Sequence, residues 1–189
     1  NYFDAFRIDH ILGFFRIWSI PMNAVEGILG HFVPSIPVHI NEFGEKGLWF
    51  DYHRYCKPYI TNEVIAERFG IYAEKLKSEF LIANDFGSYD IAEAFDTQRK
   101  VEKYFSTLQE NEENNTLKYG LYDLISNIIL IEEEKGKGLQ FHFRIAMDTT
   151  MSFRYLDDFT KQKLKELYIN YFYERQDDFW KKEAMQKLP

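Results

Sequence analysis

Apolar residues recur at helical spacing along most of this chain. Side chains three or four positions apart lie on one face of a helix, so this repeat indicates helices that pack on one side. It predicts helices over residues 62–69, 71–80, 97–108, 116–134 and 157–187. Thr61 or Asn62 fits the start of the first helix, and Gly70 fits its end.

Two segments alternate as strands do. Residues 2–8 are rich in aromatic side chains and predict a buried strand, and residues 139–146 predict another. In the first strand, Arg7 and Asp9 follow the small Ala5 on the same face. Two charges at the end of one face are typical of a strand that brings polar groups to a site.

Turn-forming residues separate these elements. Asn23 predicts the cap of a short helix over residues 24–32. Prolines and glycines predict irregular chain with short strands over residues 33–60. The polar run 111–115 predicts a mobile loop.

Together these elements predict a mostly α fold, an α-rich member of the α+β class. One strand segment comes first, and a mostly helical body follows it. The composition shifts near residues 33–37, which divides the chain into regions 1–32 and 33–189. A chain of 189 residues that is 46 % hydrophobic is long enough to bury a core.

Charge and hydropathy exclude several classes of protein. The net charge of −7 disfavours nucleic acid as a partner, because phosphate binding needs a basic surface. No apolar run reaches the roughly 20 residues that span a bilayer, so we expect no membrane partner. The start at Asn1 is neither an initiator Met nor a signal peptide, and it lies inside a predicted strand. This indicates a segment excised from a longer protein.

The sequence predicts no cofactor and no metal. Cys56 is the single cysteine, which fits a reducing compartment, and we expect a cytoplasmic protein. The histidines include no pair four positions apart with acidic support, as a zinc or iron site on a helix would need. Residues 44–47, Gly-Glu-Lys-Gly, lack the pattern of a phosphate-binding loop.

Arg7 and Asp9 are the candidates for chemistry. A guanidinium beside a carboxylate keeps that carboxylate ionised. An ionised Asp at a strand end can be a nucleophile, a cation stabiliser or a metal ligand. By spacing alone, a structural ion pair is the more common explanation of two such residues.

Residues 3–21 read F-D-A-F-R-I-D-H-I-L-G-F-F-R-I-W-S-I-P. This run resembles the strand-four region of glycoside hydrolase family 77, the 4-α-glucanotransferases of the amylomaltase type. The family pattern is close to A-x-R-I-D-H-F-R-G-F, followed by W and I-P. At Ile11-Leu12 the chain departs from the common bacterial Phe-Arg and has the form of the plant cytosolic branch.

That branch carries a long insertion between its nucleophile strand and its general-acid strand. Residues 33–189 resemble the insertion, including P-S-I-P at 34–37, K-P-Y-I at 57–60 and the run from Tyr173 to Trp180. The resemblance implies that residues 1–32 are strand four and the following helix of a (β/α)₈ TIM barrel. Residues 33–189 would then be a helical insertion subdomain.

The resemblance also implies a retaining reaction on maltose and soluble α-glucan. Asp9 would be the nucleophile, Arg7 would keep it ionised, and His10 would bind the adjacent sugar. Trp18 would bind substrate or serve only the structure. The family's acid/base Glu lies in a G-E-D-L-G motif that this chain lacks, so we expect the 189 residues alone to be inactive.

Two alternatives stay open. Glu42, at the end of a predicted strand over residues 38–42, is a rival for the acid, although no Gly-Glu-Asp context surrounds it. The chain could also be a non-catalytic helical module that binds glycan or a partner protein. The size and aromatic content of the insertion suggest a role in acceptor choice, and an unpaired barrel strand would favour oligomers.

Overall fold

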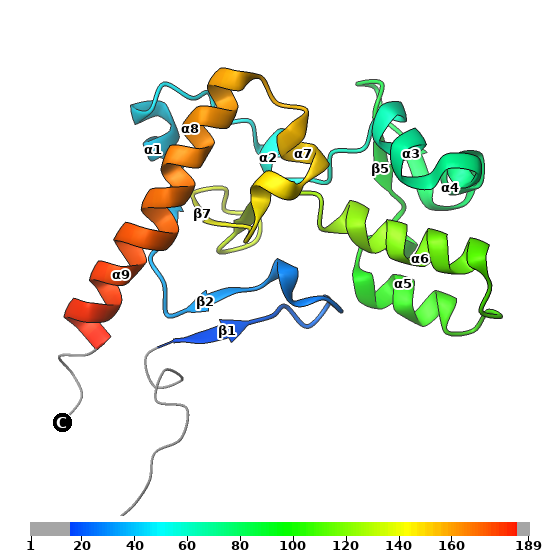
Figure 1. Ribbon diagram of the computed structural model, residues 1–189, viewed down its shortest axis with the longest axis horizontal. Coiled ribbons are helices and arrows are strands. Elements are labelled where there is room, and N and C mark those ends of the chain that lie inside the picture. The colour runs from blue at the N-terminus through cyan, green and yellow to red at the C-terminus, as the bar shows by residue number, and fades with distance from the viewer. Residues whose placement is uncertain (1–15, 185–189) are drawn as a thin grey trace, which may run out of the picture.

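The computed structural model describes residues 16–184 (Figure 1). Its α-helices are α1 (Ile40–Glu45), α2 (Tyr52–Cys56), α3 (Asn62–Phe69), α4 (Ala73–Phe80), α5 (Gln98–Phe105), α6 (Glu112–Ile125), α7 (Met151–Arg154), α8 (Asp158–Ile169) and α9 (Gln176–Phe179). Its strands are β1 (Ile17–Ser19), β2 (His31–Val33), β3 (Val38–His39), β4 (Leu81–Ala83), β5 (Tyr89–Ile91), β6 (Leu130–Glu132) and β7 (Gln140–Phe143). Helices prevail over strands, so the predicted α-rich fold is confirmed.

The strands in this part of the chain form small antiparallel sheets. β1 pairs with β2 and β4 pairs with β5, while β3, β7 and β6 form a three-stranded sheet in that order. In the first sheet Trp18 lies opposite Phe32. In the three-stranded sheet Leu130 lies opposite Phe143, and both side chains are buried.

Helices α3 to α6 enclose one cluster of buried side chains, at one end of the long axis in Figure 1. Thr61 caps α3 through the Val64 amide, and Gly70 ends it with a φ of +51°, which glycine adopts without strain. At Gly120 the helix α6 approaches Phe69 so closely that an added Cβ would lie 2.2 Å from the ring. A glycine is therefore required at this contact between α3 and α6.

The three-stranded sheet and α8 enclose a second cluster of buried side chains. Val38, Phe141 and Phe143 from the sheet are fully buried, as is Leu164 from α8. Aromatic rings supply much of the contact area, which agrees with the aromatic share of the sequence.

The C-terminal helix is continuous from α8 through a π-helical stretch (Asn170–Arg175), α9 and a second π-helical stretch (Trp180–Ala184). Asp157 caps its start by accepting from the Thr160 amide. Leu164, Leu167 and Tyr171 are buried side chains of this helix. Despite this length, no helix within residues 16–184 is apolar enough to cross a membrane.

The prediction of a helix over residues 24–32 is wrong. A single 3-10 turn (Gly27–Leu29) leads instead into β2. The amides of Val25 and Glu26, just before this turn, donate to the side chain of Gln98. Pairing of β2 with β1 then fixes the extended backbone that follows.

Three further expectations differ from the structure. The helix predicted over residues 116–134 ends at Ile125, because residues 130–132 pair with β7. The polar run 111–115 is no loop: Asn111 caps α6 by accepting from the Asn114 amide. Residues 33–60, expected to be irregular, contain α1 and α2.

Candidate functional site

The predicted catalytic segment precedes the described part of the chain. Arg7, Asp9 and His10 lie outside the described residues, so their roles remain predictions. Trp18 is described, and it lies in β1, directly downstream of that segment. The described residues that lie nearest in sequence to the predicted catalytic segment are therefore those of the β1–β2 hairpin.

Trp18 is part of the packing of this hairpin. Its indole N–H donates to the Gly27 carbonyl at 2.9 Å, and its ring meets Phe32 edge-on at 4.8 Å. A Cβ on Gly30 would lie 2.5 Å from the indole nitrogen and 2.6 Å from the Ser19 carbonyl. Gly30 therefore allows the loop to close over Trp18.

The loop of the hairpin is held by a buried glutamine from α5. The Gln98 side-chain oxygen accepts from the amides of Val25 at 2.8 Å and Glu26 at 2.9 Å. Its NH₂ group donates to the Glu26 carboxylate at 2.9 Å, and the side chain is fully buried. The Arg99 amide also donates to the Asn23 carbonyl. The loop is thereby attached to the helices of the first cluster.

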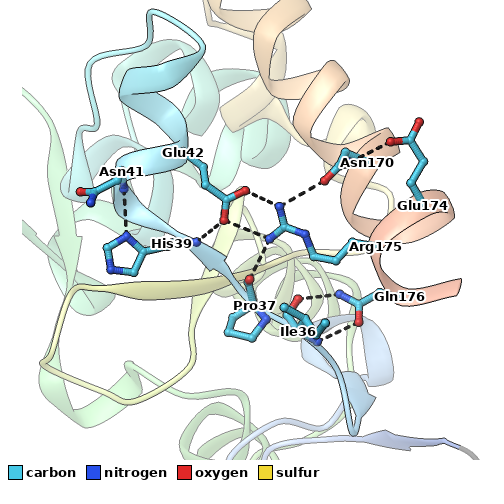
Figure 2. A network of polar contacts seen from close by, with 9 residues as sticks. All are labelled: Ile36, Pro37, His39, Asn41, Glu42, Asn170, Glu174, Arg175 and Gln176. Atoms are coloured by element: carbon cyan, nitrogen blue, oxygen red, sulfur yellow. Dashed lines mark hydrogen bonds and ion pairs between the residues drawn. The ribbon is translucent and has the colours of Figure 1, made fainter. Parts of the chain in front are cut away.

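The other end of the hairpin runs into residues 34–37, which we call the strap. Gln176, from α9, binds Ile36 twice (Figure 2): it accepts from the Ile36 amide at 2.8 Å and donates to the Ile36 carbonyl at 2.6 Å. The indole of Trp180 donates to the Pro34 carbonyl at 2.9 Å. The C-terminal helix thus satisfies backbone groups that no strand partner takes up in the strap.

Arg175 completes the attachment of the strap. Its guanidinium donates to the Pro37 carbonyl at 2.8 Å and to Glu42 at 3.1 Å through Nη1. Its Nη2 forms a second hydrogen bond to Glu42 and donates to Asn170 at 3.1 Å (Figure 2). Two parallel bonds between a guanidinium and a carboxylate fix both orientation and distance.

Glu42 is held as a structural carboxylate. Partial burial opposes its ionisation, but hydrogen bonds from Arg175 and from the His39 amide outweigh burial and hold its pKa below the usual range. Glu42 lies in the first turn of α1, in a capping box with His39, and the strand predicted to end at Glu42 stops at His39. A carboxyl that stays ionised cannot donate a proton to a leaving sugar, which argues against Glu42 as the acid.

His31, Glu133 and His142 form a cluster whose ligand atoms lie within 4.8 Å of one another. The two imidazole rings stack at 4.1 Å with an angle of 10° between their planes. Imidazole lone pairs lie in the ring plane, so those of two stacked rings do not converge on one ion. His142 already bonds Glu133 through Nε2 and the Tyr171 hydroxyl through Nδ1. The observed rotamers therefore do not fit a metal site.

The motifs were visible in the sequence, but the contacts between them were not. Residues 34–37 and the run that contains Arg175, Gln176 and Trp180 carry the resemblance, and the structure brings these two segments together. The role of Gln98 was not predicted, because its position in an amphipathic helix resembles that of any solvated glutamine. A long-range pairing of this kind has no local signal in one sequence.

Comparisons with known proteins agree with the motif. A family model described as 4-alpha-glucanotransferase matches residues 1–189. The rice (Oryza sativa subsp. japonica) protein 4-alpha-glucanotransferase DPE2 is 36 % identical over 193 residues, which is 100 % of this chain and 20 % of the relative. No solved structure matches. The chain thus spans about a fifth of that relative, and the resemblance predicted from residues 3–21 is confirmed.

Proposed function

Because this chain belongs to the 4-alpha-glucanotransferase family, glycoside hydrolase 77, we propose that its parent protein transfers glucosyl or maltosyl units between α-1,4-glucans. Maltose and soluble glucan are the substrates. The observation that carries this proposal is the run Arg7-Ile8-Asp9-His10 within a family match that extends over the whole chain. A match that includes the helical body as well as the motif does not favour the non-catalytic glycan- or protein-binding module.

The reaction is a double displacement with retention. The Asp9 carboxylate attacks the anomeric carbon, the glycosidic C–O bond breaks, and a proton from an acid elsewhere in the parent protein goes to the leaving sugar. A hydroxyl of the acceptor then attacks the same carbon, gives its proton to the conjugate base and releases Asp9. No water or cofactor enters the balance.

The neighbours of Asp9 set its charge and its substrate contacts. Arg7 keeps Asp9 ionised, because a nearby positive charge favours the carboxylate form. His10 hydrogen-bonds the sugar beside the cleaved bond. Trp18 can offer a sugar only its ring, since its N–H is donated to Gly27.

We assign residues 1–32 to strand four and the following segment of a (β/α)₈ barrel, and residues 33–189 to an inserted subdomain. Catalytic groups in such barrels lie at the carboxyl ends of the strands, where Asp9 would stand. The β1–β2 hairpin crosses the boundary between these two parts and is attached to the body by Gln98 and Gln176. A cytoplasmic location fits the single Cys56.

The change Asp9→Asn in the full-length protein tests this function. Removing the nucleophile is expected to lower glucose release from maltose by about a thousandfold or more. The matched control is Asp85→Asn, at an exposed turn, which should retain full activity. Transferase activity that survives Asp9→Asn would exclude Asp9 as the nucleophile, and a wild-type protein without activity on maltose would exclude the function.

A further inference from the structure

An open groove of about 510 Å³ lies where the C-terminal helix passes the β1–β2 hairpin. Its volume falls within the range of about 300–1,000 Å³ that is usual for sites of small molecules. Aromatic rings dominate its walls. The lining residues are Arg16, Phe32, Ile145, Tyr168, Phe172, Tyr173, Asp177 and Trp180.

One aromatic ring of the groove is exposed to solvent, and contacts among the other side chains fix the floor of the groove. Tyr173 is 71 % exposed, whereas Trp180, which also lines the groove, is buried. Phe32 meets Trp180 edge-on at 5.4 Å, and the Arg16 guanidinium lies 4.0 Å from the centre of the Trp180 ring. These contacts fix the floor of the groove, so little order must be gained when a ligand binds.

The charges of the groove favour a neutral ligand. Arg16 and Asp177 contribute one positive and one negative group, and Asp177 is also paired with Lys181. Phosphate or nucleic acid would need an excess of basic groups, which is absent from this lining. A saccharide suits the lining better, because its C–H faces pack on rings and its hydroxyls pair with polar groups at the edges.

The groove is close in sequence to the predicted catalytic segment. Arg16 follows Asp9 by seven positions, and seven residues of chain span at most about 25 Å. A glucan chain of several units that occupied the groove could therefore also reach the nucleophile.

We propose that this groove binds a stretch of the α-glucan acceptor, with Tyr173 as the ring against which a glucose unit packs. This inference rests on the proposed function and gives the inserted subdomain a part in acceptor binding. The groove contributes affinity for long acceptors and little for glucose, because a single sugar cannot occupy the groove and the catalytic centre at once.

The experiment uses the full-length protein with the changes Tyr173→Ala and Tyr173→Phe. With maltose as donor, Tyr173→Ala is expected to raise the KM for glycogen about threefold to tenfold, and to raise the KM for glucose as acceptor less. Tyr173→Phe keeps the ring and should stay within about twofold of the wild type. The control Tyr119→Ala, an exposed tyrosine on α6 away from the groove, should leave both KM values unchanged.

A glycogen KM for Tyr173→Ala equal to that of the wild type overturns the proposal, as does an equal rise for glycogen and glucose. Titration with maltoheptaose separates this result from the proposed function, since it needs no turnover. If the wild type lacks transferase activity, weaker binding of maltoheptaose to Tyr173→Ala than to Tyr119→Ala still supports the groove. Equal binding to the two variants, or none to the wild type, overturns it.

Discussion

Two glutamines illustrate how single residues hold this chain together. Gln98 and Gln176 are both buried, and each amide offers a donor and an acceptor that satisfy backbone groups distant in sequence. A buried polar group without a hydrogen-bond partner lowers the free energy of unfolding, so each of these glutamines depends on its partners. Nothing in the sequence marked Gln98, because the Val25 and Glu26 amides that it binds lie more than 70 positions away.

Replacing Gln176 should weaken the attachment of the strap. In Gln176→Ala the Ile36 amide and carbonyl lose their protein partners, and the free energy of unfolding should fall by about 1–3 kcal/mol. Urea denaturation measures this change. The control Gln162→Ala, exposed on α8, should stay within about 0.5 kcal/mol. Equal losses from the two changes would mean that the Ile36 contacts contribute nothing.

Because of the stacked pair His31 and His142, we expect the free energy of unfolding to depend on pH. Burial and the neighbouring His31 lower the pKa of His142 to about 3 and outweigh the Glu133 carboxylate at its Nε2, which favours the charged form; an unfolded histidine has a pKa of about 6.5. The unfolded chain therefore takes up the proton first as the pH falls. Stability should be complete above about pH 6.5 and decline toward pH 3 by up to about 1.4 kcal/mol per pH unit.

Denaturation at a series of pH values measures this slope. The change His142→Gln should flatten it between about pH 6 and 4, because Gln does not titrate. The control His53→Gln, exposed on α2, should keep the slope of the wild type. An unaltered slope in His142→Gln would show that other groups cause the acid sensitivity.

Among the helices and strands, those with local signals were predicted and those set by distant partners were not. Helix α3 was predicted with its limits, because Thr61 and Gly70 supply its cap and its end. The sequence pattern predicts that residues 130–132 continue a helix, because their apolar residues fit the period of a helix as well as that of a strand. Only the pairing with β7 makes them strand β6. The 3-10 turn before β2 depends likewise on Gln98.

A pair of glycines tests the packing of α3 against α6. In Gly120→Ala the new Cβ would meet the Phe69 ring at 2.2 Å, so the helices must move apart at a cost of about 1–3 kcal/mol. In Gly44→Ala, within α1, nothing lies within 4 Å of the Cβ, and stability should rise by up to about 1 kcal/mol. Thermal unfolding compares the two. A Gly120→Ala variant as stable as the wild type would contradict the close packing.

On the scale of the whole molecule, the β1–β2 hairpin connects the two clusters of buried side chains. Its loop is attached to α5 by Gln98, and the strap that follows it is attached to the C-terminal helix by Gln176 and Trp180. The body thus holds residues 17–37, which begin eight positions after the predicted nucleophile. Membership of the family was predictable from the run at residues 3–21, whereas this support was not, because it depends on contacts across the whole fold.

Covalent trapping tests most directly whether Asp9 is the nucleophile. A fluorinated glycosyl donor that slows release of the intermediate is incubated with the full-length protein, and the labelled peptide is identified by mass spectrometry. The label is expected on Asp9, and Asp9→Asn should take up none. A label on any other side chain would contradict the proposed mechanism.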